Sequence, residues 1–118
     1  MTDSQRLVRR MVTTFPVLEG LLEEHLQDME GELLPYLLLA DVARWANEAV
    51  GFDAERVTEL VDWLEAEFVS SQPPERDLIG LGFVEAIPST PYGDPVLRLL
   101  GPAMHEVAAE LGLLIGDN

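Results

Sequence analysis

The sequence predicts an all-α fold of about six helices, packed as antiparallel pairs in one compact bundle or short helical array. Apolar residues recur every three or four positions along most of the chain, which is the spacing of an amphipathic helix. Prolines and glycines fall between these runs, where helices begin and end. No segment alternates apolar and polar residues for long enough to compete as a strand. At this length we expect one domain, covering residues 1–118.

Three helices are predicted in the first half of the chain. The first covers about residues 3–14, with an apolar side opposite three arginines. The second starts at Pro16, a residue suited to a first helical turn, and continues to about Met29. The third begins at Pro35 and reaches Val50, where a glycine follows. Prolines at two starts and a glycine at one end therefore set the boundaries.

The fourth helix has the clearest pattern. Asp53 is a suitable N-cap, and residues 70–74 end the helix with two prolines. A shorter fifth helix is predicted over residues 78–87, after an Asp77 cap. Its two glycines weaken it but allow close packing around Phe83. The fourth helix carries an apolar stripe at i, i+3, i+4 and i+7 spacing, formed by Val57, Leu60, Val61, Leu64 and Phe68.

The last helical segment is predicted to open at Asp94, which reads as an N-cap before Pro95 at the first helical position. The residues before it, 88–93, are rich in proline and form a loop. Gly101 and the proline after it kink or split the helix before it ends at Gly112. This segment is the sixth helix of the predicted fold.

The composition is strongly acidic. The chain has 22 acidic residues against seven basic ones and a net charge of -15 at pH 7. All seven basic residues are arginines, and there is no cysteine for a disulfide or a thiolate. The N-terminal segment has no secretory signal pattern, and no apolar run approaches the ~20 residues of a membrane span. We therefore expect a soluble, cytoplasmic protein that binds neither membrane nor nucleic acid.

No motif in the sequence predicts an enzyme. His25 and His105 share no local motif, and neither has a glutamate three residues before it, as a di-iron bundle requires. No serine lies in a Gly-x-Ser-x-Gly elbow, and no glycine loop suits a phosphate. His25 falls within an apolar stripe, where a hydrogen-bonded core or interface histidine is favoured over a ligand or proton switch. We expect no catalytic residue, cofactor or metal.

Exposed carboxylates are the candidate binding residues. Glu55, Glu59 and Asp62 lie about one turn apart on the fourth helix, opposite its apolar stripe. Solvated helix faces ordinarily mix both charges, whereas this one is mostly acidic. Glu85 and Asp94, near the 88–93 loop, are second choices. This pattern predicts a surface that binds a basic partner, although a plain solvated face is the alternative.

Aromatic and basic residues add three further expectations. Trp63 lies on the flank of the fourth helix, where it is either an interface anchor or covered by another helix of the same chain. Trp45 falls among apolar residues and is predicted to be core. The arginines of the first helix oppose its dipole. They are expected to pair with acidic neighbours or with a second subunit in a homodimer.

Four stretches within about residues 15–110 carry a resemblance, namely Gly31–Tyr36, Leu39–Trp45, Gly82–Ile87 and Leu97–Pro102. They resemble a family of small, acidic, uncharacterised helical proteins of actinobacteria and other bacteria. Members of this kind are similar in size and acidity to immunity proteins, which neutralise secreted polymorphic toxins. The resemblance implies no catalytic or ligand residues.

Three functions remain open from the sequence. The first is an immunity-type inhibitor that docks its acidic surface on a basic toxin domain, such as a nuclease, because nucleases that bind phosphates are basic. The second is a regulator that mimics nucleic acid with spaced carboxylates. The third is a structural or accessory dimer subunit whose acidity serves solubility. The first is favoured, with a basic protein as the partner.

Overall fold

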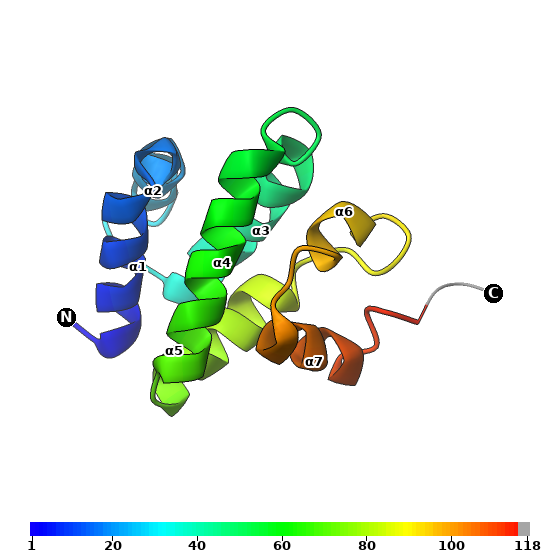
Figure 1. The fold of residues 1–118 in the computed structure, drawn as a ribbon. Helices are drawn as coiled ribbons and strands as arrows, with labels where there is room; N and C mark the ends of the chain where they lie inside the picture. Colours follow the sequence, from blue (N-terminus) through cyan, green and yellow to red (C-terminus); the bar gives the residue numbers. More distant parts are fainter. Residues whose placement is uncertain (116–118) are drawn as a thin grey trace.

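Every regular element of the computed structural model, which describes residues 1–115, is helical. The all-α prediction is therefore confirmed for this part of the chain, and residues 116–118 of the predicted domain lie outside it. No helix in residues 1–115 is both long and apolar enough to cross a membrane. Figure 1 shows the elements, which are α1 Asp3–Thr14, η1 Pro16–Leu18, α2 Glu19–Asp28, α3 Pro35–Ala49, α4 Ala54–Ser70, α5 Pro73–Asp77, η2 Leu78–Val84, α6 Asp94–Leu97 and α7 Pro102–Glu110.

The first helix, α1, has the predicted bounds, and a capping box fixes its start. The backbone N–H of Gln5 donates to Thr2 Oγ1 over 3.1 Å, and the backbone N–H of Thr2 donates to Gln5 Oε1 over 3.0 Å. Two N–H groups that the helix cannot satisfy itself are thereby bonded. The second predicted helix begins at Pro16 as expected, but its first turn is the 3₁₀ turn η1 before α2.

The fifth helix starts earlier than the sequence predicted. Pro73 opens α5, and Asp77 is its last residue. Asp77 also occupies the predicted N-cap position before Leu78, but its side chain makes no capping hydrogen bond. The chain then continues into the π-helix η2, where the Glu85 N–H donates to the Gly80 carbonyl over 3.1 Å, five residues back. A proline in a first turn loses no helical hydrogen bond, so the proline pair that ends α4 also begins α5. The predicted helix over 78–87 is thus the continuation of α5.

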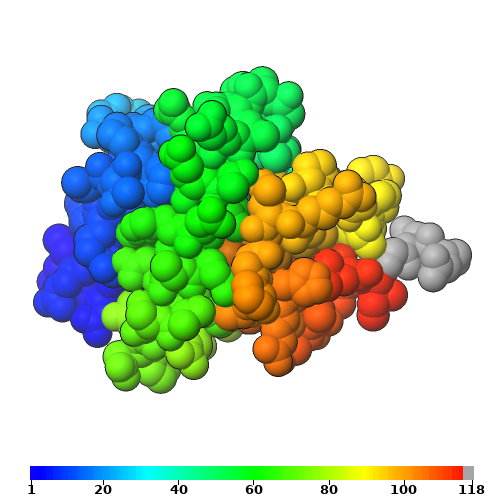
Figure 2. All heavy atoms as spheres, viewed as in Figure 1, coloured from blue at the N-terminus to red at the C-terminus, as the bar shows by residue number. Residues whose placement is uncertain are grey.

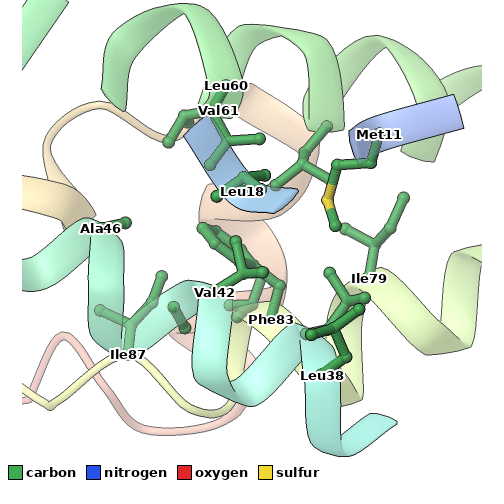
Figure 3. Packing of buried hydrophobic residues seen from close by; sticks show 14 of the residues in the cluster. Met11, Leu18, Leu38, Val42, Ala46, Leu60, Val61, Ile79, Phe83 and Ile87 are labelled. Carbon is green, nitrogen blue, oxygen red and sulfur yellow. The ribbon is translucent and has the colours of Figure 1, made fainter. Parts of the chain in front are cut away.

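The most extensive contact between two elements is that of η2 with α3, and both contribute buried residues to the hydrophobic core. Gly82 makes this close approach possible, because a Cβ there would lie only 3.1 Å from the Cβ of Leu39. Phe83 is completely buried beside it, as the sequence predicted. Figure 3 shows Phe83 near Leu18 of η1 and Val42 of α3. Close packing is therefore confirmed at Gly82 and the anchor at Phe83, whereas a Cβ at Gly80 would make only ordinary contacts, the nearest 3.6 Å from Val107.

A carboxylate of α4 binds the start of α7. Glu65 accepts hydrogen bonds from the backbone N–H groups of Ala103 and Met104, each over 2.9 Å, at the start of α7. The break before α7 falls at Gly101, as predicted. The sequence placed the N-cap of the preceding helix at Asp94. The structure places it at Gly93, and Asp94 is the first residue of α6.

Candidate functional site

The acidic ridge, defined as Glu55, Glu59 and Asp62, is exposed on the outer face of α4. The opposite face of the same helix is buried at the predicted apolar stripe, except that Phe68 is only partly covered. Figure 2 shows the side chains of the α4 segment, in green, running across the middle of one face of the molecule. Within residues 1–115, no ion pair or hydrogen bond involves a ridge carboxylate. The three charges are therefore available to a partner.

Arginine is part of the same surface. Arg56 Nε lies 3.2 Å from Asp53 Oδ2, and both side chains line a hollow of about 210 Å³ with Glu55 and Glu59. Asp53 occupies the N-cap position as predicted, but its side chain makes no capping hydrogen bond. The carboxylate that would cap the helix pairs instead with Arg56. The surface around the ridge is therefore acidic overall but not uniformly so.

Trp63 is half-buried rather than free. Its ring meets that of Phe15 edge to face, with centroids 6.0 Å apart and planes at 84°. Aromatic pairs favour this geometry. Of the two interpretations that the sequence left open, the structure shows at least partial cover by the α1–η1 junction of the same chain. Trp45 is also only partly buried, so its prediction as a core residue was too strong.

Phe52 is an exposed aromatic residue that sequence reasoning missed. It lies in the turn between α3 and α4 and is 81% exposed. Its backbone N–H donates to the Ala49 carbonyl over 3.0 Å, so the turn that carries it is hydrogen-bonded. The sequence did contain a signal for this exposure, because Phe52 stands between a glycine and an aspartate and outside the apolar patterns of both flanking helices. Phe52 places apolar surface three residues before Glu55, at the start of the ridge.

The two second-choice carboxylates lie on other elements. Glu85 is exposed just after η2, and Asp94 is half-buried at the start of α6, with its Oδ2 3.7 Å from Arg98 Nη2. In Figure 1, α6 and α1 lie on opposite sides of α4. Glu59 faces the α1 side, because it shares a hollow of about 150 Å³ with Phe15. Asp94 therefore belongs to a different side of the molecule from the ridge.

His25 is 3% exposed, and its Nε2 accepts a hydrogen bond from the Leu34 N–H over 3.0 Å. The prediction of a hydrogen-bonded core histidine is confirmed. His105 is exposed on α7, so the two histidines lie on separate helices and in different environments. No three histidine, aspartate or glutamate side chains in residues 1–115 are grouped so that they could hold a metal ion.

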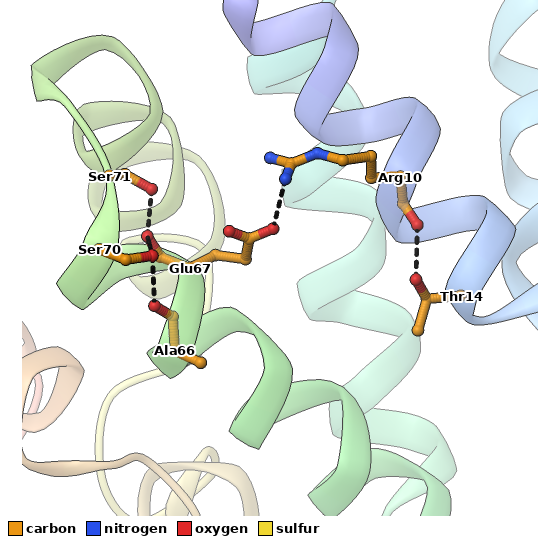
Figure 4. A network of polar contacts seen from close by, with 6 residues as sticks. All are labelled: Arg10, Thr14, Ala66, Glu67, Ser70 and Ser71. Atoms are coloured by element: carbon orange, nitrogen blue, oxygen red, sulfur yellow. Dashed lines mark hydrogen bonds and ion pairs between the residues drawn. The ribbon is translucent and has the colours of Figure 1, made fainter.

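Two of the three arginines of α1 pair with acidic neighbours, which is one of the two predicted alternatives. Arg6 Nη1 lies 2.9 Å from Asp3 Oδ1 on the same helix. Arg10 Nη1 lies 2.8 Å from Glu67 Oε1 and joins α1 to α4 (Figure 4). Figure 4 also shows the Ser70 hydroxyl donating to the Ala66 carbonyl over 2.9 Å at the end of α4. Two arginines of the cluster thus serve contacts within the chain.

Comparison with protein families matches residues 8–113 to a domain of unknown function, DUF7674. No curated protein and no solved structure matched the chain. The match spans the sequence from within α1 to just beyond α7, so it covers the ridge, the α3–α4 turn and the core. The chain therefore belongs to the DUF7674 family.

Proposed function

We propose that the chain is a protein-binding module without catalytic activity, an immunity-type inhibitor that acts in the cytoplasm. Its acidic surface docks on a basic toxin domain, such as a nuclease, and covers the channel for the substrate. The observation that carries this proposal is the acidic ridge: three exposed carboxylates on successive turns of one helix, with no internal partner in the described residues. A net charge of -15 would speed the approach of a basic partner and disfavour acidic ones.

The ridge suits recognition because its backbone is held rigidly. The four residues Val57, Leu60, Val61 and Leu64 are buried on the inner face of α4, so the helix cannot rotate or detach without exposing them. A preformed surface loses little conformational entropy on binding. The carboxylates would therefore meet a partner in a fixed arrangement, which is what charge complementarity requires.

The test is capture followed by inhibition. The tagged chain is used to capture proteins from its native host, and each captured protein is produced separately and assayed for toxicity and nuclease activity. We expect one basic protein that is toxic alone and loses its activity when the chain is added in equal amount. Full activity in the presence of saturating chain would contradict the inhibitor proposal. Release of a harmless DNA-binding protein from its DNA would favour a nucleic-acid mimic instead.

We propose that Phe52 supplies the apolar anchor of this interface, because it is 81% exposed whereas Trp63 is half-buried against Phe15. Phe52→Ala should raise the dissociation rate about tenfold, with little dependence on salt, since a buried aromatic anchor acts through burial. Trp63→Ala is the matched control: it should lower the free energy of unfolding and leave the dissociation rate nearly unchanged. Surface plasmon resonance with the captured partner measures both rates. A larger rise in the dissociation rate for Trp63→Ala than for Phe52→Ala would place the anchor at Trp63.

A further inference from the structure

A second acidic feature lies between α2 and α3. A hollow of about 330 Å³ opens there, within the size range of small-ligand pockets. Four carboxylates line it, from Glu24 and Asp28 on α2 and from Asp41 and Glu48 on α3. The one basic side chain in its lining, Arg44, pairs with Asp41. The lining thus carries a net charge of -3, and the hollow favours a cation.

The carboxylates of the hollow come from two helices and are not gathered at one point. Among residues 1–115, no three acidic or histidine side chains are close enough to one another to hold a metal ion. Glu24, Asp28 and Glu48 have no ion pair or hydrogen bond within the same part of the chain. A larger cation with several N–H donors can reach separated carboxylates, and the guanidinium group has five such donors.

Trp45 supplies an aromatic wall to the hollow. It is half-buried against the core, and the rest of its surface contributes to the lining. A planar guanidinium stacks on an indole face and is more weakly hydrated than an ammonium group. Trp45 together with the carboxylates therefore favours arginine over lysine as the bound side chain.

His25 adds an independent observation that points to a ligand. It lines the same hollow although it is 3% exposed. Its Nε2 accepts from the Leu34 N–H, so the proton of the neutral ring lies on Nδ1, and Nδ1 has no hydrogen-bond partner in residues 1–115. The buried side-chain polar atoms without a partner in that range are Asn47 Oδ1 and Glu75 Oε2, so Nδ1 is accessible. A nearly buried donor in the lining of an acidic hollow suits a ligand that also presents an acceptor, such as a peptide carbonyl.

We propose that the hollow between α2 and α3 binds an arginine residue of a protein partner. The guanidinium would lie against Trp45 and among the carboxylates, and the backbone carbonyl of the same segment would accept the proton of His25 Nδ1. The identification of the partner as basic rests on the proposed function. The affinity for peptidyl arginine does not, because it depends only on the hollow.

Nuclear magnetic resonance with a small probe tests this site directly. The probe is the tripeptide acetyl-Gly-Arg-Gly-amide, titrated into the ¹⁵N-labelled full chain. The neutral control is the citrulline tripeptide, which matches arginine in shape, and the lysine tripeptide tests charge alone. We expect saturable shifts of the Trp45 indole N–H and the His25 ring at a dissociation constant of about 1–10 mM, as suits a single side chain. The lysine tripeptide should bind more weakly, and the citrulline tripeptide should not shift these signals.

Matched variants separate the hollow from the general charge. Glu24→Gln with Glu48→Gln should weaken arginine binding by at least about fivefold, because two carboxylates that face the ligand are lost. Glu55→Gln with Glu59→Gln removes the same charge from the ridge and should change binding less than twofold. The proposal would be overturned if the two double variants weakened arginine binding equally. It would also be overturned if the citrulline tripeptide bound as well as the arginine tripeptide, or if the shifts never saturated.

The outcomes also separate this site from the proposed function. Peptide binding in the hollow, together with a chain that inhibits no toxin, would leave the arginine site standing and remove the inhibitor proposal. Inhibition of a captured toxin without any peptide binding in the hollow would remove the arginine site and keep the inhibitor.

Discussion

Replacing Phe83 with alanine is expected to lower the free energy of unfolding by about 3–5 kcal/mol, the usual range for a buried phenylalanine. Phe83 is completely buried at the contact between η2 and α3. The cost combines lost burial with a cavity, because Gly82 already holds η2 tightly against Leu39 and leaves the backbone little room to collapse. Urea unfolding of the purified variant, followed by circular dichroism, measures the change.

Leu81 provides the control for Phe83, because it lies on the same π-helix but is 50% exposed. Leu81→Ala should cost less than about 1 kcal/mol, since much of its side chain is already in water. If Phe83→Ala and Leu81→Ala lowered the free energy of unfolding by similar amounts, a different side of η2 would face the core. The arrangement of η2 on α3 would then be wrong.

Removing the carboxylate of Glu65 is the second large effect. Glu65→Ala should lower the free energy of unfolding by about 1–3 kcal/mol, because two backbone N–H groups at the start of α7 lose a charged acceptor. A negative charge also stabilises that end of the helix dipole. Gly101→Ala should have a similar effect by another route, since a Cβ there would overlap the Glu65 side chain and displace it.

A double-mutant cycle tests whether Glu65 and Gly101 act together. In the Glu65→Ala background, Gly101→Ala should cost less than about 0.5 kcal/mol, because the side chain that it displaces is gone. Glu106→Gln, an exposed change on α7, is the charge control and should also stay below about 0.5 kcal/mol. If the two substitutions lowered the free energy of unfolding additively, the cost of Gly101→Ala would come from the backbone at Gly101 and not from displacement of Glu65.

Local patterns in the sequence were sufficient to predict most helices. The stripe on α4, the prolines at the starts of η1 and α3, and the break at Gly101 all lie where periodicity and turn residues placed them. Errors arose where one residue type has two roles. Pro73 reads equally as the end of one helix and the start of the next, and an aspartate before a helix can pair with an arginine instead of capping, as Asp53 does.

Candidate site residues were less predictable, because exposure depends on contacts between distant segments. Helical spacing was enough to place the ridge carboxylates on the outer face of α4. It could not show that Phe15 of the α1–η1 junction partly covers Trp63, nor that Phe52 remains exposed in its turn. The role of Glu65 depends on a contact 38 residues along the chain, which no local pattern contains.

Neutralising the ridge tests recognition by charge. Glu55→Gln, Glu59→Gln and Asp62→Asn together keep side-chain size and leave the core untouched, so folding should survive. The control removes the same charge elsewhere through Glu30→Gln, Glu106→Gln and Glu110→Gln, all of which are exposed. Any difference between these two triple variants then reports the position of the charges rather than their number.

The direct measurement is the association rate of the captured basic partner with both triple variants at low and high salt. At low ionic strength we expect the association rate of the ridge variant to be lower than that of the native chain by about tenfold or more. The association rate of the control variant should fall much less. The difference should shrink at 1 M salt, where the Debye length contracts to about 3 Å. Equal association rates for the two variants at low salt would contradict a docking surface on α4.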